Sequence, residues 1–95
     1  MRKYEIMYVV RPNLEEEGRK AVIELYNNAI TKNGGEIVES KEWGMKELAY
    51  AIQDFTKGYY VVLTAMLTNE AREEFNRLAR ISEDVIRYIV VKEEE

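Results

Sequence analysis

The apolar residues of this chain change their spacing in a fixed order (strand-like, helical, strand-like), and the chain then repeats that order. Tyr4 to Val10, Tyr59 to Leu67 and Val85 to Val91 are strand-like runs, and residues 36–46 form an outer, partly exposed strand in this interpretation. The order predicts an α+β, ferredoxin-like βαββαβ sandwich. We expect a four-stranded antiparallel sheet in the order 4-1-3-2, with two helices on one face.

The size and composition of the chain restrict the classes of function that it can have. A chain of 95 residues has room for one core, so we expect a single domain over residues 1–92 and a short acidic tail at 93–95. The sequence has no cysteine and no histidine, which removes thiolate chemistry and the commonest general base and metal ligand. We therefore expect no enzyme, no metal, no cofactor and no small-molecule substrate.

The chain also carries no targeting or membrane signal. No apolar run approaches the roughly 20 residues that a membrane span needs. Met1 leads directly into a strand-like run with no signal peptide. We therefore expect a cytoplasmic protein that makes no membrane contact.

The first helix has recognisable ends. An apolar stripe at helical spacing runs from Leu14 to Ile30, and Gly34-Gly35 is expected to end the helix. Asn13 is the candidate N-cap, because Glu16 follows three residues later as in a capping box.

The second helix is expected to begin near Thr68-Asn69 and to end around Ser82. Residues 48–52 are apolar but fit neither a strand nor a helix period. With Lys57-Gly58, they are predicted to form a long connection to the third strand.

Strand alternation leaves one set of apolar side chains on the sheet face that no helix covers. The inward set of the first strand is Tyr4, Ile6, Tyr8 and Val10, and the outward set of the sheet is Met7, Val9, Tyr60, Val62, Met66, Ile89 and Val91. Contiguous exposed apolar patches usually mark partner sites, so we expect the outward set to bind a partner. A one-residue shift in the third strand would instead expose Tyr59, Val61, Leu63 and Ala65.

The formal charge of −4 disfavours binding of nucleic acid by bulk charge. In the predicted topology, however, basic residues gather at the two ends of the sheet. One cluster contains Arg2, Lys3 and Lys92, and the other contains Arg11, Lys46, Lys57 and Arg87. Such clusters can position phosphates, and ordinary solvated surface is the alternative for each residue taken singly.

Two functional motifs are matched only in part. The run Lys57-Gly58-Tyr59-Tyr60-Val61-Val62 resembles the aromatic octamer of RNA-recognition-motif domains, but later aromatic positions hold Val61 and Thr64. Arg11 and Asn13 are similar to the arginine and asparagine of acylphosphatases, without the glycine-containing anion loop between them.

Segments spread over the whole chain carry a more specific resemblance. They are Met1-Arg2-Lys3-Tyr4-Glu5, Pro12-Asn13-Leu14, Trp43 to Ile52, Lys57-Gly58-Tyr59-Tyr60, Ile81 to Val85, Arg87 and Val90-Val91-Lys92. In this order they resemble the family of bacterial small-subunit ribosomal protein six. The pattern Gly-x-x-x-Leu-Ala-Tyr-x-Ile at residues 44–52 is the most specific part.

The resemblance implies a non-catalytic structural protein of the small ribosomal subunit, located on the ribosome. It implies binding to the central domain of 16S rRNA as a heterodimer with small-subunit ribosomal protein eighteen. The RNA contacts carried over by position are Arg2, Tyr4, Lys57, Arg87 and Lys92. Protein eighteen would dock on the exposed sheet face and on the segment after Val91. The alternative from another class is a small regulatory or sensor domain that dimerises through the same sheet face.

Overall fold

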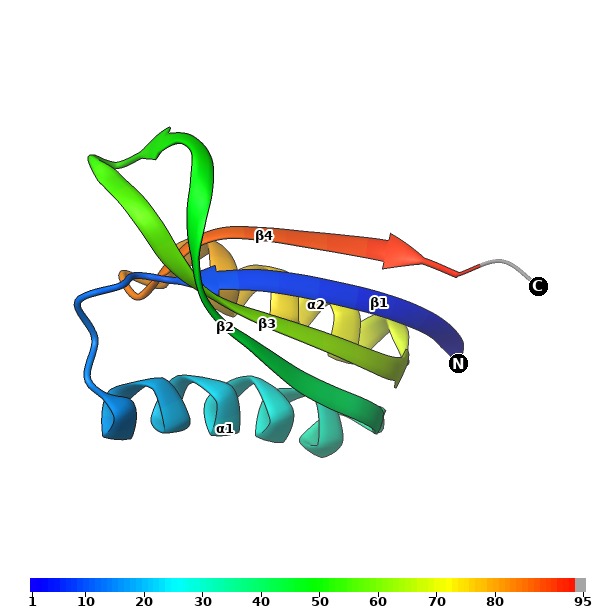
Figure 1. Ribbon diagram of the computed structural model, residues 1–95. Coiled ribbons are helices and arrows are strands. Elements are labelled where there is room, and N and C mark those ends of the chain that lie inside the picture. The colour runs from blue at the N-terminus through cyan, green and yellow to red at the C-terminus, as the bar shows by residue number, and fades with distance from the viewer. Residues whose placement is uncertain (94–95) are drawn as a thin grey trace.

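The computed structural model describes residues 1–93, and its elements follow the predicted order (Figure 1). The elements are β1 (Arg2–Val10), α1 (Glu16–Lys32), β2 (Glu36–Ile52), β3 (Phe55–Leu67), α2 (Asn69–Ile81) and β4 (Val85–Lys92). The strands form one antiparallel sheet in the order β2-β3-β1-β4, which is the predicted order read from the other edge. Both helices lie on the same face of the sheet (Figure 1), so the ferredoxin-like prediction is confirmed.

The hydrophobic core lies between the sheet and the two helices. Alternate side chains of β1 and β3 point toward the helices, and Tyr8, Val61 and Leu63 are completely buried there. The ring of Tyr8 packs with those of Tyr26 on α1 and Phe75 on α2, with ring centroids 5.1 to 6.2 Å apart. Because Val61 and Leu63 are buried, the one-residue shift considered for the third strand is excluded.

The prediction that Asn13 caps α1 is wrong. The helix begins at Glu16, and the N-cap residue Glu15 makes no side-chain hydrogen bond to the helix. The Oδ1 atom of Asn13 instead accepts a hydrogen bond from Arg11 Nη1 at 2.9 Å, so the asparagine is held outside the helix. The start of α2 is where we expected it, and Thr68 is the N-cap, with its hydroxyl accepting from the backbone N–H of Ala71 at 3.0 Å.

The long connection predicted between the second and third strands is also wrong. Strand β2 continues to Ile52 and β3 begins at Phe55, so only Gln53 and Asp54 turn the chain. Both have positive φ angles, 51° and 68°, as the two-residue hairpin turn that suits twisted strands requires. Periodicity gives no signal here, because the hairpin rises out of the sheet (Figure 1) and its pairing register shifts after Glu47.

Candidate RNA-binding and partner-binding surfaces

The sheet face opposite the helices, called the bare face below, is crossed by a row of three apolar side chains. Met7 of β1 is paired with Val62 of β3 on one side and with Ile89 of β4 on the other. All three side chains are partly exposed. The other members of the predicted outward set that remain at least partly exposed are Tyr60, Met66 and Val91. The chain by itself therefore leaves an apolar surface open to solvent.

Val9 belongs to the same predicted set but is only 1% exposed. Its side chain lies against the base of the β2–β3 hairpin, where Gly58 comes so close that a Cβ atom there would collide with Val9 Cγ1. The Cδ1 atom of Ile86 would lie 3.6 Å from the same Cβ position. Val9 is thus covered by its own chain, and its assignment to the partner-binding set is corrected.

Polar and aromatic residues flank the apolar row. Lys41 of β2 pairs with Val62, and Glu5 of β1 pairs with Val91 of β4 one row further along the strands. A shallow hollow of about 190 Å³ on this face is lined by Glu5, Glu39, Lys41, Trp43, Val62 and Thr64. Trp43 is 53% exposed, and alternation did not single it out because the β2 register shifts between Glu42 and Gly44.

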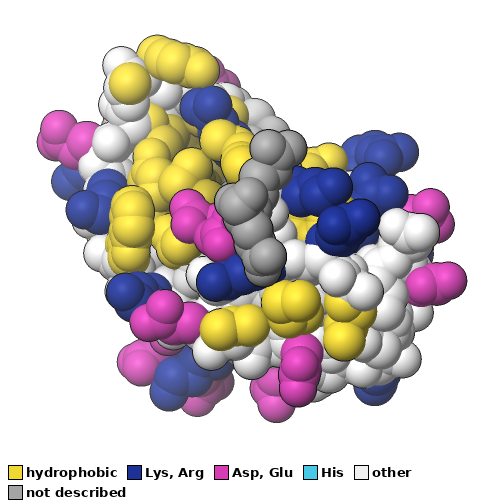
Figure 2. All heavy atoms as spheres, turned by 90° about the vertical axis from the view of Figure 1, so that its right-hand side faces the viewer, with side chains coloured by type: hydrophobic (Ala, Val, Ile, Leu, Met, Phe, Trp, Pro, Cys, Tyr) yellow, Lys and Arg dark blue, Asp and Glu magenta, His cyan; other side chains and the backbone are white. Residues whose placement is uncertain are grey.

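The predicted RNA contacts divide between the two ends of the sheet. At the end near both termini, Tyr4 of β1 pairs with Lys92 of β4, and Arg2 lies two residues before Tyr4. The carbonyl of Lys3 accepts from the N–H of Glu93 at 2.9 Å, and Lys3 Nζ lies 3.5 Å from Glu93 Oε2. Residues 94 and 95 of the predicted acidic tail lie outside the described residues. Figure 2, which looks at this end, shows hydrophobic side chains gathered at the upper left and a group of Lys and Arg side chains at the right, with further Lys and Arg side chains along the left margin.

The remaining two predicted RNA contacts lie where the hairpin leaves the sheet. Arg87 of β4 donates from Nη1 to the hydroxyl of Tyr50 on β2 at 3.4 Å. Lys57 of β3 pairs with Glu47 of β2 in the same hairpin. The five predicted contacts therefore do not form one site, and any RNA that touches all of them must span the sheet.

Arg11, expected in the second basic cluster, forms hydrogen bonds within the chain. Its Nε donates to Asp84 Oδ1 at 2.8 Å and its Nη1 donates to Asn13 Oδ1. Two of the three guanidinium nitrogen atoms of Arg11 thus bond within the chain, one of them to a carboxylate, and this arrangement does not support an acylphosphatase-like anion site. Residues 1–93 contain no group of His, Cys, Asp or Glu side chains arranged to hold a metal ion. No helix in that range has the length and apolar character to cross a membrane.

The two tyrosines of the octamer-like run point in opposite directions. Tyr59 faces the helices, where its hydroxyl donates to Glu42 Oε1 at 2.7 Å and its ring centroid lies 4.5 Å from the guanidinium carbon of Arg19. The hydrogen bond to Glu42, with burial, raises the pKa of Tyr59, because ionisation would remove the donated proton. Tyr59 is thus not free to stack a base, whereas Tyr60 remains partly exposed on the bare face.

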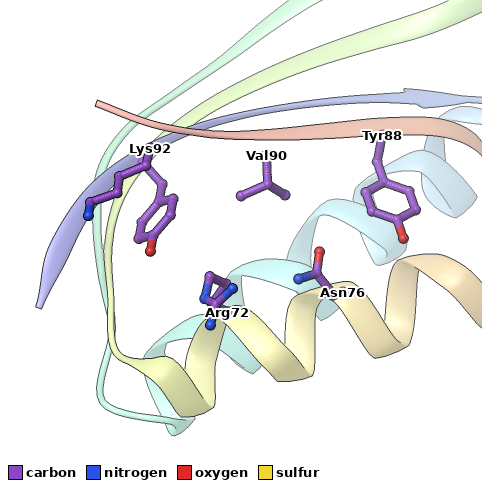
Figure 3. A pocket seen from close by; sticks show the side chains of 6 residues that line it. Arg72, Asn76, Tyr88, Val90 and Lys92 are labelled. Carbon is purple, nitrogen blue, oxygen red and sulfur yellow. The ribbon is translucent and has the colours of Figure 1, made fainter. Parts of the chain in front are cut away.

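A groove on the helix side of the sheet joins Tyr4 and Lys92 to residues that the sequence analysis missed. It lies between α2 and the edge strand β4 and has a volume of about 430 Å³ (Figure 3). Its lining residues are Tyr4, Arg72, Asn76, Tyr88, Val90 and Lys92. Nothing in the spacing of Arg72 or Asn76 distinguishes them from the other polar residues of an amphipathic helix, so only the packing of α2 reveals them.

Comparison with known proteins agrees with this geometry. The family model described as ribosomal protein S6 matches residues 3–92. A crystal structure of 30S ribosomal protein S6 from Thermotoga maritima is similar, with a TM-score of 0.92 and 28% sequence identity. The match covers 97% of this chain and 87% of that chain. The chain therefore belongs to the ribosomal protein S6 family of structural, non-catalytic proteins, which are ribosome-bound in the cytoplasm and associate with 16S rRNA in the small subunit.

Proposed function

We propose that this chain binds the central domain of 16S rRNA as a heterodimer with small-subunit ribosomal protein eighteen. The observation that carries the proposal is the row of Val62, Met7 and Ile89, which three adjacent strands leave partly exposed. Covering such a surface with a second protein removes apolar area from water, worth about 25 cal/mol per Å². The proposed protein-binding set is Met7, Tyr60, Val62, Met66, Ile89 and Val91, with Trp43 at its rim.

One carboxylate on the bare face favours a basic partner. Glu5, Glu39 and Lys41 line the same hollow as Trp43, and Glu39 Oε1 lies 3.4 Å from Lys41 Nζ, whereas Glu5 has no ion pair within residues 1–93. A basic protein docked there would be attracted by Glu5 and would offset the net charge of −4, which opposes approach to RNA. We therefore expect the pair to bind rRNA more tightly than either protein alone.

The proposed RNA contacts are Arg2, Tyr4, Lys57, Arg87 and Lys92. Each phosphate that a Lys or Arg neutralises releases counterions, and the logarithm of affinity falls with the logarithm of salt by about 0.9 per contact. Binding of the pair to rRNA should thus weaken steeply with salt. The contact between the two proteins is mainly apolar and should weaken less.

The test replaces Val62 with lysine and measures binding of protein eighteen by calorimetry. We expect Val62→Lys to weaken binding about tenfold or more, because an ammonium group would be desolvated in the interface and would face a basic partner. The matched control is Leu25→Lys on α1, where the wild-type side chain is 51% exposed on the helix side of the molecule. This control should bind protein eighteen like the wild type.

Three outcomes would contradict the proposal. Val62→Lys could bind protein eighteen as tightly as the wild type does. The chain alone could bind the central-domain transcript as tightly as the pair. The isolated chain could form a dimer that Val62→Lys dissolves and that protein eighteen does not disrupt, which would favour the regulatory-domain alternative.

A further inference from the structure

The groove between α2 and β4 exists because α2 does not cover the outer strand of the sheet. Tyr88, Val90 and Lys92 alternate onto the helix side of β4, opposite Tyr8, Ile6 and Tyr4 of β1. The apolar residues of this strip, Tyr88 and Val90, are partly packed against the core, and the Tyr88 ring meets Phe75 of α2 edge-on, with ring centroids 6.1 Å apart. The strip remains partly exposed, and the side chains of Arg72 and Asn76 face it from α2 (Figure 3).

The groove is basic and contains no acidic residue among those that line it. Neither Arg72 nor Lys92 forms an ion pair with any residue in the described range 1–93. The Nε atom of Arg72 is buried and has no hydrogen-bond acceptor within that range. A buried donor without an acceptor is unfavourable, so an anion that reoriented the guanidinium would relieve a cost already present in the free chain.

The charge of Arg72 does not stabilise α2. It lies in the first turns of α2, which begins at Asn69, and this is the positive end of the helix dipole. A cation there is repelled by the dipole, whereas an anion in the groove would be attracted by the arginine, the lysine and the dipole together. The position of Arg72 near the positive end of α2 thus suits an anionic ligand in the groove.

The other lining residues suit a nucleobase. Tyr4 and Tyr88 contribute aromatic rings, Val90 contributes an apolar surface between Tyr88 and Lys92, and Asn76 offers an amide donor and acceptor (Figure 3). Proteins recognise unpaired RNA bases by stacking on aromatic rings and by hydrogen bonds to the base edge. The volume of about 430 Å³ falls within the usual range for sites that hold a molecule of nucleotide size.

We propose that this groove binds one unpaired nucleotide of the rRNA, with its phosphate at Arg72 and Lys92 and its base against Tyr88 and Val90, beside Asn76. The inference rests on the proposed rRNA binding and extends it. Tyr4 and Lys92, expected to contact RNA by resemblance, then belong to one site with Arg72, Asn76 and Tyr88. A paired base would not enter, because its edge and both faces are already engaged in the duplex.

The first test compares Arg72→Gln with Arg77→Gln in the heterodimer. Both substitutions remove one positive charge from α2, but Arg77 lies outside the groove and is ion-paired with Glu74. We expect Arg72→Gln to weaken binding of the central-domain transcript about fivefold or more and to reduce the salt slope by about one. Arg77→Gln should change the affinity less than about twofold. Equal effects of the two variants would overturn the inference.

The second test identifies the occupant by NMR of the ¹⁵N-labelled chain. A single-stranded RNA hexamer should shift the side-chain signals of Arg72 and Asn76, and a paired duplex of the same sequence should not. Equal shifts with the duplex would mean that the groove binds only the charge of the RNA backbone. Displacement of the hexamer by a hexaglutamate peptide at equal concentration would indicate a protein ligand. Either result would overturn the proposal. If the wild-type heterodimer failed to bind the transcript, the proposed function would fall while the hexamer titration still tested the groove.

Discussion

Gly58 provides a test of how the base of the hairpin is built. A Cβ atom at this position would overlap Val9 Cγ1 and would lie 3.6 Å from Ile86 Cδ1 and from the carbonyl oxygen of Val10. Val9 is 1% exposed and β-branched, so it has little freedom to rotate away. We therefore expect Gly58→Ala to be destabilising even though alanine is normally the better residue within a strand.

The change that Gly58→Ala makes in the free energy of unfolding is the sum of two opposing effects. Replacing glycine in a strand interior should by itself stabilise the chain by roughly 0.5–1 kcal/mol through reduced unfolded-state entropy. Overpacking a filled site typically costs about 1–3 kcal/mol. With a buried neighbour on the line of the new Cβ, the clash should cost about 2–3 kcal/mol, which leaves a net loss of about 1–2.5 kcal/mol in the free energy of unfolding. For a chain of this size, each kcal/mol lowers the unfolding temperature by roughly 4–8 °C.

The assay is urea unfolding of four proteins: wild type, Gly58→Ala, Val9→Ala and the double variant. Val9→Ala removes the methyl group with which the new Cβ would collide, so Gly58→Ala should become neutral or stabilising in that background. The urea concentration at the midpoint of unfolding should change, while the slope of the unfolding free energy against urea concentration should stay constant. Two results would refute the proposed close contact. Gly58→Ala could lower stability equally in the wild type and in Val9→Ala, or it could lower stability in neither.

Three other measurements test the core and the helix start. Thr68→Ala should destabilise by about 1 kcal/mol in urea unfolding, because it removes the hydroxyl that accepts from Ala71, while Glu15→Ala should have little effect because Glu15 makes no cap hydrogen bond. Tyr8→Phe should be neutral or stabilising by up to about 1 kcal/mol at pH 7, because the Tyr8 hydroxyl is buried without a partner in the described residues. Burial, and then the nearby Tyr26, raises the pKa of Tyr8 in the folded state, so folding stability should hold below the normal tyrosine pKa of about 10 and fall as the pH rises above it. The fall between pH 10 and 11 should be smaller in Tyr8→Phe, and an equal fall in both proteins would contradict this assignment.

The fold could be predicted from the sequence because its buried residues obey simple periods. Burial alternates along β3 from Val61 to Leu67 and along β1 up to Tyr8, with Ile6, Tyr8, Val61 and Leu63 on the helix side, so the order of elements and the bare face could be predicted from spacing. The hairpin could not be predicted in this way. Its arms leave the sheet, and its turn uses Gln53 and Asp54 at positive φ rather than a glycine that would have marked the turn.

The candidate surfaces were only partly predictable, for a different reason. Alternation gives the direction of a side chain relative to the sheet, but it does not say what else covers that side chain. Val9 points to the bare face yet is covered by the chain at Gly58 and Ile86. Arg72 and Asn76 become part of a site only because α2 leaves the edge of β4 uncovered. The non-catalytic role, in contrast, is established by membership of the family.

Strand β4 connects the two proposed binding surfaces. Its odd-numbered residues Ile89 and Val91 belong to the bare face, where we place the partner protein, and its even-numbered residues Tyr88 and Lys92 line the groove, where we place an RNA nucleotide. Beyond β4 there is no further strand in the sheet formed by residues 1–93, so only β1 holds it in register. A partner that fixes the odd-numbered side chains would also restrict the motion of the even-numbered ones. RNA binding would then cost less conformational entropy of the protein, because these side chains are already ordered. By thermodynamic reciprocity, RNA in the groove must strengthen partner binding by the same factor. Dependence of rRNA affinity on the heterodimer thus has a physical basis beyond the added charge of the partner, and this part of the coupling should persist at high salt.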